Sequence, residues 1–83
     1  MEVTLKLYAW LADLLPANRQ SNRVVVEVGQ GETVAGLLAR FRVPEADARI
    51  VLKNGCFVPP DARATTPLAP GDVVAVWPPV AGG

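Results

Sequence analysis

The 83-residue sequence has no histidine and only one cysteine, Cys56. Histidine is the commonest general base and metal ligand near neutral pH, and a single cysteine can form neither an internal disulfide nor a cysteine-rich metal site. We therefore do not expect this chain to be an enzyme that works with its own side chains. No basic residue or histidine adjoins Cys56 to activate its thiol, so we expect a buried or half-buried residue of a hairpin.

The sequence also lacks an excess of charge and any long apolar run. Eight Lys and Arg residues balance eight Asp and Glu residues, whereas proteins that bind nucleic acid usually carry a basic stripe. Although 51% of the residues are hydrophobic, no apolar run approaches the ~18 residues of a membrane span, and Glu2 stands where a secretory signal would be basic. We expect a cytoplasmic protein that binds neither nucleic acid nor membrane.

Three segments have the patterns of β-strands. Apolar and polar residues alternate in residues 2–7 and 24–28, which predicts two strands, each with one buried face, joined as a hairpin. Residues 73–77 are almost continuously apolar, which is typical of a strand that is covered on both faces or lies at the centre of a sheet. Between the first two strands, apolar residues at helical spacing predict one or two helical turns that end before Pro16.

The clearest helix is predicted to begin after Thr33, which stands at the N-cap position. Its apolar residues recur at positions i, i+3, i+4 and i+7 and are expected in the core: Val34, Leu37, Leu38 and Phe41. Gly36 costs about 1 kcal/mol relative to alanine inside a helix. We therefore expect a close contact between helix and sheet at Gly36.

A hairpin is predicted around Asn54-Gly55, the strongest short-range signal of a hairpin turn. The flanking segments 50–53 and 56–58 are its two short strands. Residues 59–70 carry prolines but no apolar period, so we expect a surface loop with at most one turn of helix.

In that loop, Arg63 is expected in a solvated turn, and Pro70-Gly71 fits the centre of a type II turn. The order of the predicted elements is strand, strand, helix, short hairpin, strand, which indicates an α+β fold with a mixed sheet and one main helix across one face. We divide the chain into a single domain, residues 1–77, and an extended C-terminal tail, residues 78–83.

The tail is the one feature that suggests chemistry, and it consists of Pro78, Pro79, Val80, Ala81, Gly82 and Gly83. Its two prolines favour an extended, low-entropy arm. Gly82 and Gly83 have no Cβ, so they can thread a channel of another enzyme that is too narrow for other residues. The terminal carboxyl group of Gly83 is then the reactive group. The alternative is an ordinary frayed terminus. We favour the reactive terminus, because the two glycines occur together with a proline spacer and a small domain without catalytic side chains.

Several segments together resemble a known family. They are Leu7-Tyr8-Ala9 with Leu14-Leu15, Gly31-Glu32-Thr33-Val34 with Leu37-Leu38, Asn54-Gly55, Leu68-Ala69-Pro70-Gly71-Asp72-Val73-Val74, and Trp77-Pro78-Pro79-Val80-Ala81-Gly82-Gly83. The chain resembles the small subunit of molybdopterin synthase and its relatives, the ubiquitin-like sulfur carriers that include the thiazole-pathway carrier of thiamine synthesis. The most specific match is the Gly-Asp-x-Val strand that runs into Pro-Pro-Val-x-Gly-Gly.

The resemblance implies a ubiquitin-like β-grasp fold in which the first and last strands are parallel neighbours. It also implies that a ubiquitin-activating-type enzyme adenylates the carboxyl group of Gly83 and that a persulfide donor converts it to a thiocarboxylate. The chain itself is then expected to bind no cofactor, since the activating enzyme uses the ATP. The charged tail would enter the large subunit of molybdopterin synthase, or another acceptor enzyme, and give its sulfur there.

The resemblance leaves the pathway open. The short stretch 42–49 and the aromatic Trp10 depart from many molybdopterin-type members, whereas Pro78-Pro79 is closer to that type than to the thiazole type. A carrier for thiazole or another pathway, a ubiquitin-like modifier joined through Gly83 to lysines, and a binding module with an irrelevant tail are the alternatives. For docking on partner enzymes we predict an exposed apolar patch beside the tail, formed by Trp77, Tyr8 and Phe57. The alternative for Trp77 and Tyr8 is a place in the core.

Overall fold

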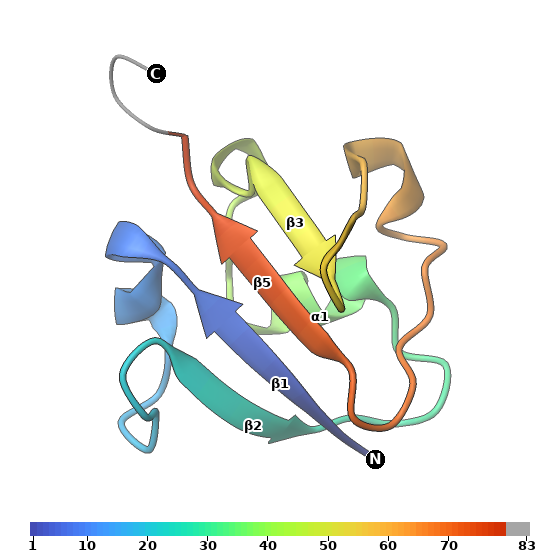
Figure 1. Cartoon of the computed structure of the whole chain (residues 1–83), viewed down its shortest axis with the longest axis horizontal. Helices are drawn as coiled ribbons and strands as arrows, with labels where there is room; N and C mark the ends of the chain where they lie inside the picture. The colour runs from blue at the N-terminus through green and yellow to red at the C-terminus, as the bar shows by residue number, and fades with distance from the viewer. Residues whose placement is uncertain (80–83) are drawn as a thin grey trace.

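The computed structural model describes residues 1–79, which form five strands, one α-helix and three short 3-10 helices (Figure 1). In chain order these are β1 (Glu2–Leu7), η1 (Ala9–Leu14), β2 (Arg23–Glu27), α1 (Val34–Arg40), η2 (Glu45–Asp47), β3 (Ile50–Lys53), β4 (Cys56–Phe57), η3 (Pro60–Ala62) and β5 (Val73–Trp77). The predicted strands are all present, and the helical turns predicted before Pro16 are η1. No helix among these residues is long and apolar enough to cross a membrane.

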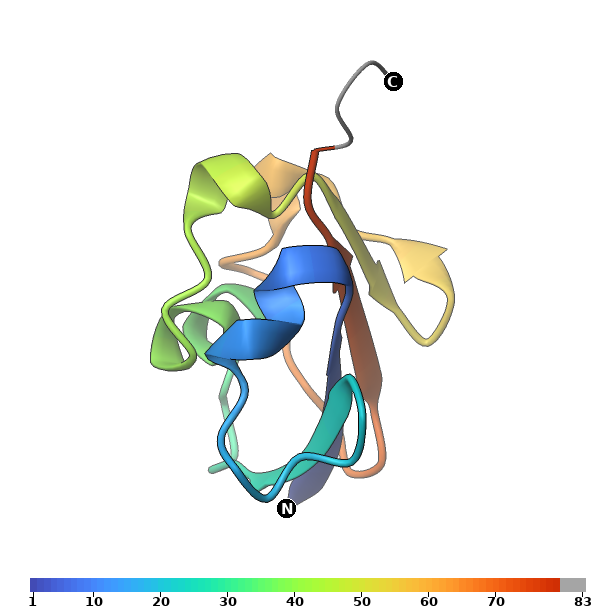
Figure 2. The same ribbon diagram turned by 90° about the vertical axis from the view of Figure 1, so that its left-hand side faces the viewer.

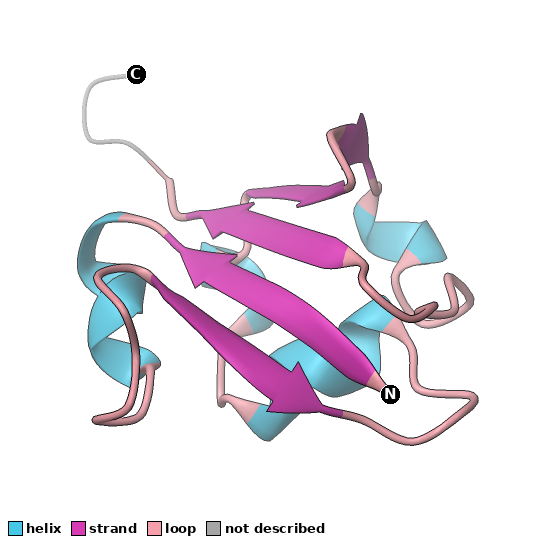
Figure 3. Cartoon of the chain, turned by 60° about the horizontal axis from the view of Figure 1, so that its bottom comes forward, coloured by secondary structure: helices cyan, strands magenta, loops and turns pink. Residues whose placement is uncertain are grey.

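The strands form one mixed sheet in the order β2-β1-β5-β3-β4. β1 and β5 are parallel neighbours, whereas β2 pairs with β1, and β3 pairs with both β5 and β4, in antiparallel fashion. Figure 3 shows α1 crossing one face of the sheet, and in Figure 2 the helices of the described chain lie on that same side. Parallel first and last strands with one main helix across one face are the β-grasp arrangement, so the predicted fold is confirmed.

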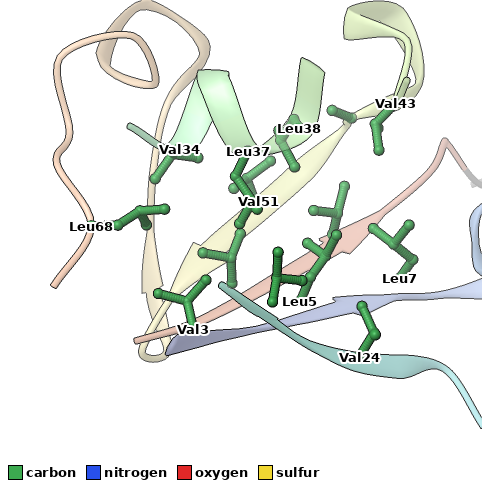
Figure 4. Close-up of a cluster of buried hydrophobic side chains, with 14 of the residues drawn as sticks. Val3, Leu5, Leu7, Val24, Val34, Leu37, Leu38, Val43, Val51 and Leu68 are labelled. Carbon is green, nitrogen blue, oxygen red and sulfur yellow. The ribbon is translucent and has the colours of Figure 1, made fainter. Parts of the chain in front are cut away.

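The hydrophobic core fills the space between the sheet and α1 (Figure 4). Alternation along the strands turns every second side chain inward, and the helical stripe of α1 meets them from the other side. Residues closed almost completely to solvent are Val3, Leu5, Leu7, Leu11, Val34, Leu37, Val51, Val74 and Val76. Full burial of each such side chain stabilises the fold by about 1.5–3 kcal/mol before the entropy of ordering is subtracted.

The start of α1 confirms one prediction and corrects another. Thr33 is the N-cap residue, and its Oγ1 accepts a hydrogen bond from the N–H of Gly36 at 3.1 Å. A Cβ at Gly36 would collide with Oε1 of Glu32 and not with the sheet, so the expected helix-to-sheet contact there is wrong. The glycine instead leaves room for the Glu32 side chain. Phe41 caps the C-terminus of α1 and is only partly buried at the edge of the core, because the helix has already ended at Arg40.

The predicted hairpin turns at Asn54 and Gly55, whose φ angles of 52° and 83° match the left-handed conformation that a two-residue turn of this type requires. Cys56 then pairs with Lys53 across the hairpin. The expectation that Cys56 is buried is wrong, since its side chain is exposed. β4 is a two-residue strand at the edge of the sheet, so too little of the fold surrounds it to cover the thiol.

The loop between β4 and β5 contains the single helical turn that was predicted, η3. Gly71 has a φ of 81°, as a type II turn requires at this position. Arg63, however, does not lie in a solvated turn, because only 5% of the residue is exposed. Its guanidinium group donates to the carbonyl oxygens of Ala48 at 2.7 Å and Val58 at 3.2 Å, and these bonds hold it inside the protein.

The buried carboxylate of Asp72 ties the hairpin to the start of β5. It accepts hydrogen bonds from the side-chain amide of Asn54 at 2.8 Å and the N–H of Ala69 at 2.8 Å, and the ammonium group of Lys53 lies 3.5 Å away. The Asn54 carbonyl oxygen in turn accepts from the N–H of Val73 at 2.9 Å. The bond from Asn54, and after it the one from Ala69, hold the pKa of Asp72 below its ordinary value, although burial acts in the opposite direction.

Replacing Asp72 by asparagine should lower the free energy of unfolding at neutral pH by about 1–3 kcal/mol, because hydrogen bonds to a charged acceptor are lost. The folded-state pKa of Asp72 lies below its unfolded-state value, so this stabilisation is complete above the unfolded-state pKa and disappears as the pH falls through the folded-state pKa. Urea unfolding between neutral and acid pH should therefore show a shallower acid decline in D72N than in the parent chain.

Asp61→Asn is the matched control, since Asp61 is exposed in η3. An equal loss of stability in both variants at neutral pH, or the same acid decline in D72N as in the parent chain, would contradict this role of Asp72.

Candidate docking surface beside the C-terminal segment

β5 leads directly from the centre of the sheet into the C-terminal segment (Figures 1 and 2). Its last residue, Trp77, is fixed from one side by the N–H of Arg49, which donates to the Trp77 carbonyl oxygen at 3.0 Å. From the other side, the N–H of Tyr8 donates to the carbonyl oxygen of Val76, the residue before Trp77, at 3.0 Å. Pro78 has no N–H with which to continue the ladder, so pairing ends there. Pro78 is buried, whereas Pro79, the last described residue, is exposed.

Most of the predicted tail lies outside the described residues. This holds for Val80, Ala81, Gly82 and Gly83, so a threading role for the first three and the reactive terminus at Gly83 remain predictions. The threading role of Pro78 and Pro79 and the division of the chain at residue 77 are predictions too. What the described residues establish is the starting point, a rigid strand end from which the segment continues.

Tyr8 and Trp77 stack on each other at this strand end. Their ring centroids are 4.1 Å apart, and the ring planes differ by 11°. Both rings lie on the face of the sheet opposite α1, because the preceding residues Leu7 and Val76 are paired neighbours that point into the core. The aromatic pair therefore marks the outer face of the sheet at the base of the C-terminal segment.

An apolar surface extends from this pair toward β4. Ile50 lies opposite Trp77, and Leu52 lies opposite Phe57, so all of them share the outer face. We call these five residues the open-face patch: Tyr8, Ile50, Leu52, Phe57 and Trp77. Phe57 is 57% exposed and Ile50 43% exposed, which is unusual for side chains of this size.

The structure thus brings the three predicted docking residues onto one face and joins them through two residues that sequence reasoning missed. Tyr8, Phe57 and Trp77 were predicted; Ile50 and Leu52 were not. The sequence did contain a signal for these two residues. Every second residue of a strand faces the same side, so Ile50 and Leu52 face outward if Val51 between them faces the core. Whether the patch docks on partner enzymes remains a prediction.

The other half of the outer face is charged. Lys6 lies opposite Arg23 and Glu2 lies opposite Glu27, while Val25 between them is 58% exposed. Charges of one sign therefore face each other at each end of the β1–β2 ladder, and the positive pair is at the end from which β1 continues into Tyr8. Within residues 1–79 there is no group of three or more His, Cys, Asp or Glu side chains that could hold a metal ion.

A β-grasp sheet with one main helix and a C-terminal segment leaving from a central strand defines a ubiquitin-like protein. The chain belongs to the ThiS family, whose family model matches residues 5–83. It is accordingly a small ubiquitin-like protein of the sulfur-carrier and modifier class. A search of the curated proteins finds no match.

Solved structures similar to this chain include two of small archaeal modifier protein 1 from Haloferax volcanii. The first, under the name SAMP1, shares 27% identity over 100% of both chains with a TM-score of 0.70. The second shares 25% identity over 95% of this chain and 98% of that chain, with a TM-score of 0.69.

Proposed function

We propose that this chain is a sulfur carrier whose reactive group is the C-terminal carboxylate of Gly83. An adenylating enzyme joins that carboxylate to the AMP part of ATP and releases pyrophosphate, because a free carboxylate is a poor electrophile. The terminal sulfur of a persulfide donor then attacks the carbonyl carbon, and AMP leaves. Gly83 is now joined to the donor through an acyl disulfide. A thiol attacks the donor's sulfur atom in this bond, forms a new disulfide with the donor, and releases Gly83 as a thiocarboxylate.

The observation that carries this proposal is the continuity between the open-face patch and the tail. Trp77 belongs to the patch and is also the last residue of β5, so a partner that covers the patch is placed at the origin of the tail. Six extended residues from Pro78 onward span roughly 20 Å. That reach is enough for the terminal carboxyl group to enter an active site buried within the docked partner.

We further propose that the acceptor is the pterin precursor of the molybdenum or tungsten cofactor, with this chain as the small subunit of the synthase. The double proline of Pro78-Pro79-Val80 supports this choice over a thiazole acceptor. Capture of the tagged chain from its own cells separates the two pathways. Recovery of a molybdopterin-synthase-type large subunit is expected, and recovery of a thiazole synthase in its place would exclude this acceptor.

A second function, covalent modification of proteins, is favoured by the similarity to the structures of small archaeal modifier protein 1. In that role the activated carboxyl group of Gly83 forms an isopeptide bond with a lysine of the target. Peptides that carry the C-terminal glycines on lysine, found in digested cell protein, would establish this role. Both roles use the same adenylate, so they are compatible in one protein.

Incubation of the full chain with its adenylating enzyme, ATP and a persulfide donor should replace one oxygen atom of the chain by sulfur. Intact-mass spectrometry would detect the difference between the two atoms, and fragmentation should locate it at Gly83. A chain that lacks Gly82 and Gly83 is the control and should keep its mass. An unchanged mass of the full chain, under conditions that charge a known carrier, would contradict the proposed carrier chemistry.

Phe57→Ala should raise the chain concentration needed for half-maximal adenylation by about tenfold or more, because a few large aromatic side chains carry most of the binding energy of a docking surface. Val25→Ala is the matched control, since Val25 is exposed to almost the same extent, on the same face, but outside the patch. ATP–pyrophosphate exchange measures the reaction, and thermal unfolding verifies that both variants fold. Equal effects of the two substitutions would contradict docking through the patch.

A further inference from the structure

A cavity of about 340 Å³ lies on the helix side of the molecule, away from the open-face patch. Its walls come from α1, from the segment around η2 and from η3. The lining residues are Ala35, Leu38, Ala39, Val43, Glu45, Ala48, Pro60, Arg63 and Ala64. Most of them are small and apolar, and only Glu45 and Arg63 carry charge. The volume is at the lower end of the range for small-molecule sites, roughly 300–1,000 Å³.

Arg63 is the unusual member of this lining, because it is a buried charge without an ion pair among residues 1–79. Its Nε and Nη1 atoms donate to the carbonyl oxygens of Val58 and Ala48. Its own carbonyl oxygen accepts from the N–H of Ala35, in the first turn of α1, at 2.9 Å. These bonds explain how Arg63 holds three segments together, but the side chain uses only two of its three nitrogen atoms in them.

The remaining nitrogen of that group, Nη2 of Arg63, is buried and has no hydrogen-bond partner in the described chain. Leaving such a donor unpaired is costly, by about 1–3 kcal/mol and more for a charged group, so nearly all buried donors have partners. Neither the protein nor bulk water completes its hydrogen bonding. Arg63 lines the cavity, so a carboxylate bound there would pair with Nη2 once the guanidinium group turns toward it.

Glu45 supplies the opposite charge on the same cavity. Glu45 is exposed and forms no ion pair with Arg63. Burial lowers the pKa of Arg63, and the negative charge of Glu45 is near enough to act in the opposite direction. A simple anion would be repelled by Glu45, and a simple cation by Arg63. A ligand that carries an ammonium group and a carboxylate on the same carbon atom would satisfy both residues.

We propose that this cavity binds a free α-amino acid with a small apolar side chain. Its carboxylate pairs with the guanidinium group of Arg63, its ammonium group pairs with Glu45, and its side chain lies against Leu38, Val43 and the alanines. Each of the three groups of the ligand meets a matching part of the cavity. The proposal does not use Gly83 and is independent of the carrier function.

Titration of the isotope-labelled full chain with L-leucine, followed by amide NMR, tests this binding. The amide signals of Ala35, Leu38, Ala48 and Ala64 should shift saturably, with a dissociation constant on the order of 1 mM, which corresponds to about 4 kcal/mol. Leucinamide lacks the carboxylate and N-acetylleucine lacks the ammonium group, so each should bind at least about tenfold more weakly. Glu45→Gln should weaken leucine binding and strengthen that of N-acetylleucine, because the variant no longer pairs with the ammonium group and no longer repels an anion.

Ala64→Leu fills the cavity without removing Arg63 and should abolish the shifts. Ala46→Leu, at an exposed alanine of η2 outside the lining, is the matched control and should leave binding intact. Absence of saturable shifts, leucine binding that survives Ala64→Leu, or equally tight binding of N-acetylleucine or acetate would overturn the proposal. Truncation after Pro79 should leave the four signals in place; if truncation shifts them, the carboxylate of the chain itself is the occupant and the proposal is wrong.

Discussion

The parallel pairing of β1 with β5 is the interaction on which the rest of the structure depends. It joins residues near the two ends of the chain, as in the pairing of Leu5 with Val74, and it sets both strands at the middle of the sheet. The inward side chains of these strands form the floor on which α1 packs, and the outward ones end in the Tyr8–Trp77 stack. β2 pairs with the other side of β1, and β3 pairs with the other side of β5. A shift by one residue would turn the core side chains outward and separate the two rings.

Much of this fold can be predicted from the sequence, because it rests on local patterns. Alternation marks the strands, helical spacing marks α1, Thr33 marks its start, and Asn54-Gly55 marks the hairpin. The errors concern residues whose surroundings local sequence patterns do not specify. The sequence cannot show that Cys56 lies at an uncovered edge, that Gly36 accommodates a neighbouring side chain, or that carbonyl oxygens of residues 48 and 58 converge on one guanidinium group. Such contacts exist only once the chain is folded.

The residues of the candidate site likewise divide into those that the sequence predicts and those that only the folded structure shows. Tyr8, Phe57 and Trp77 could be chosen from the sequence because large aromatic side chains beside a proline-rich terminal segment suggest recognition. Ile50 and Leu52 join them only through the register of β3 with β5 and β4. The open-face patch and the cavity at Arg63 lie on opposite faces of the sheet. A protein that covers the patch therefore leaves the cavity open to a small molecule.

The position of β5 has a consequence for how the chain matures. β5 is synthesised after the other four strands, yet it lies between β1 and β3, which share no other neighbour. Contacts between segments so far apart in the chain form late in folding, because a long loop must close before they contribute. A nascent chain that stops before residue 77 therefore has neither a closed core nor an assembled open-face patch. The tertiary structure therefore forms only after synthesis has reached the residues from which the terminal segment begins, and an incomplete chain cannot present the finished outer face of the sheet.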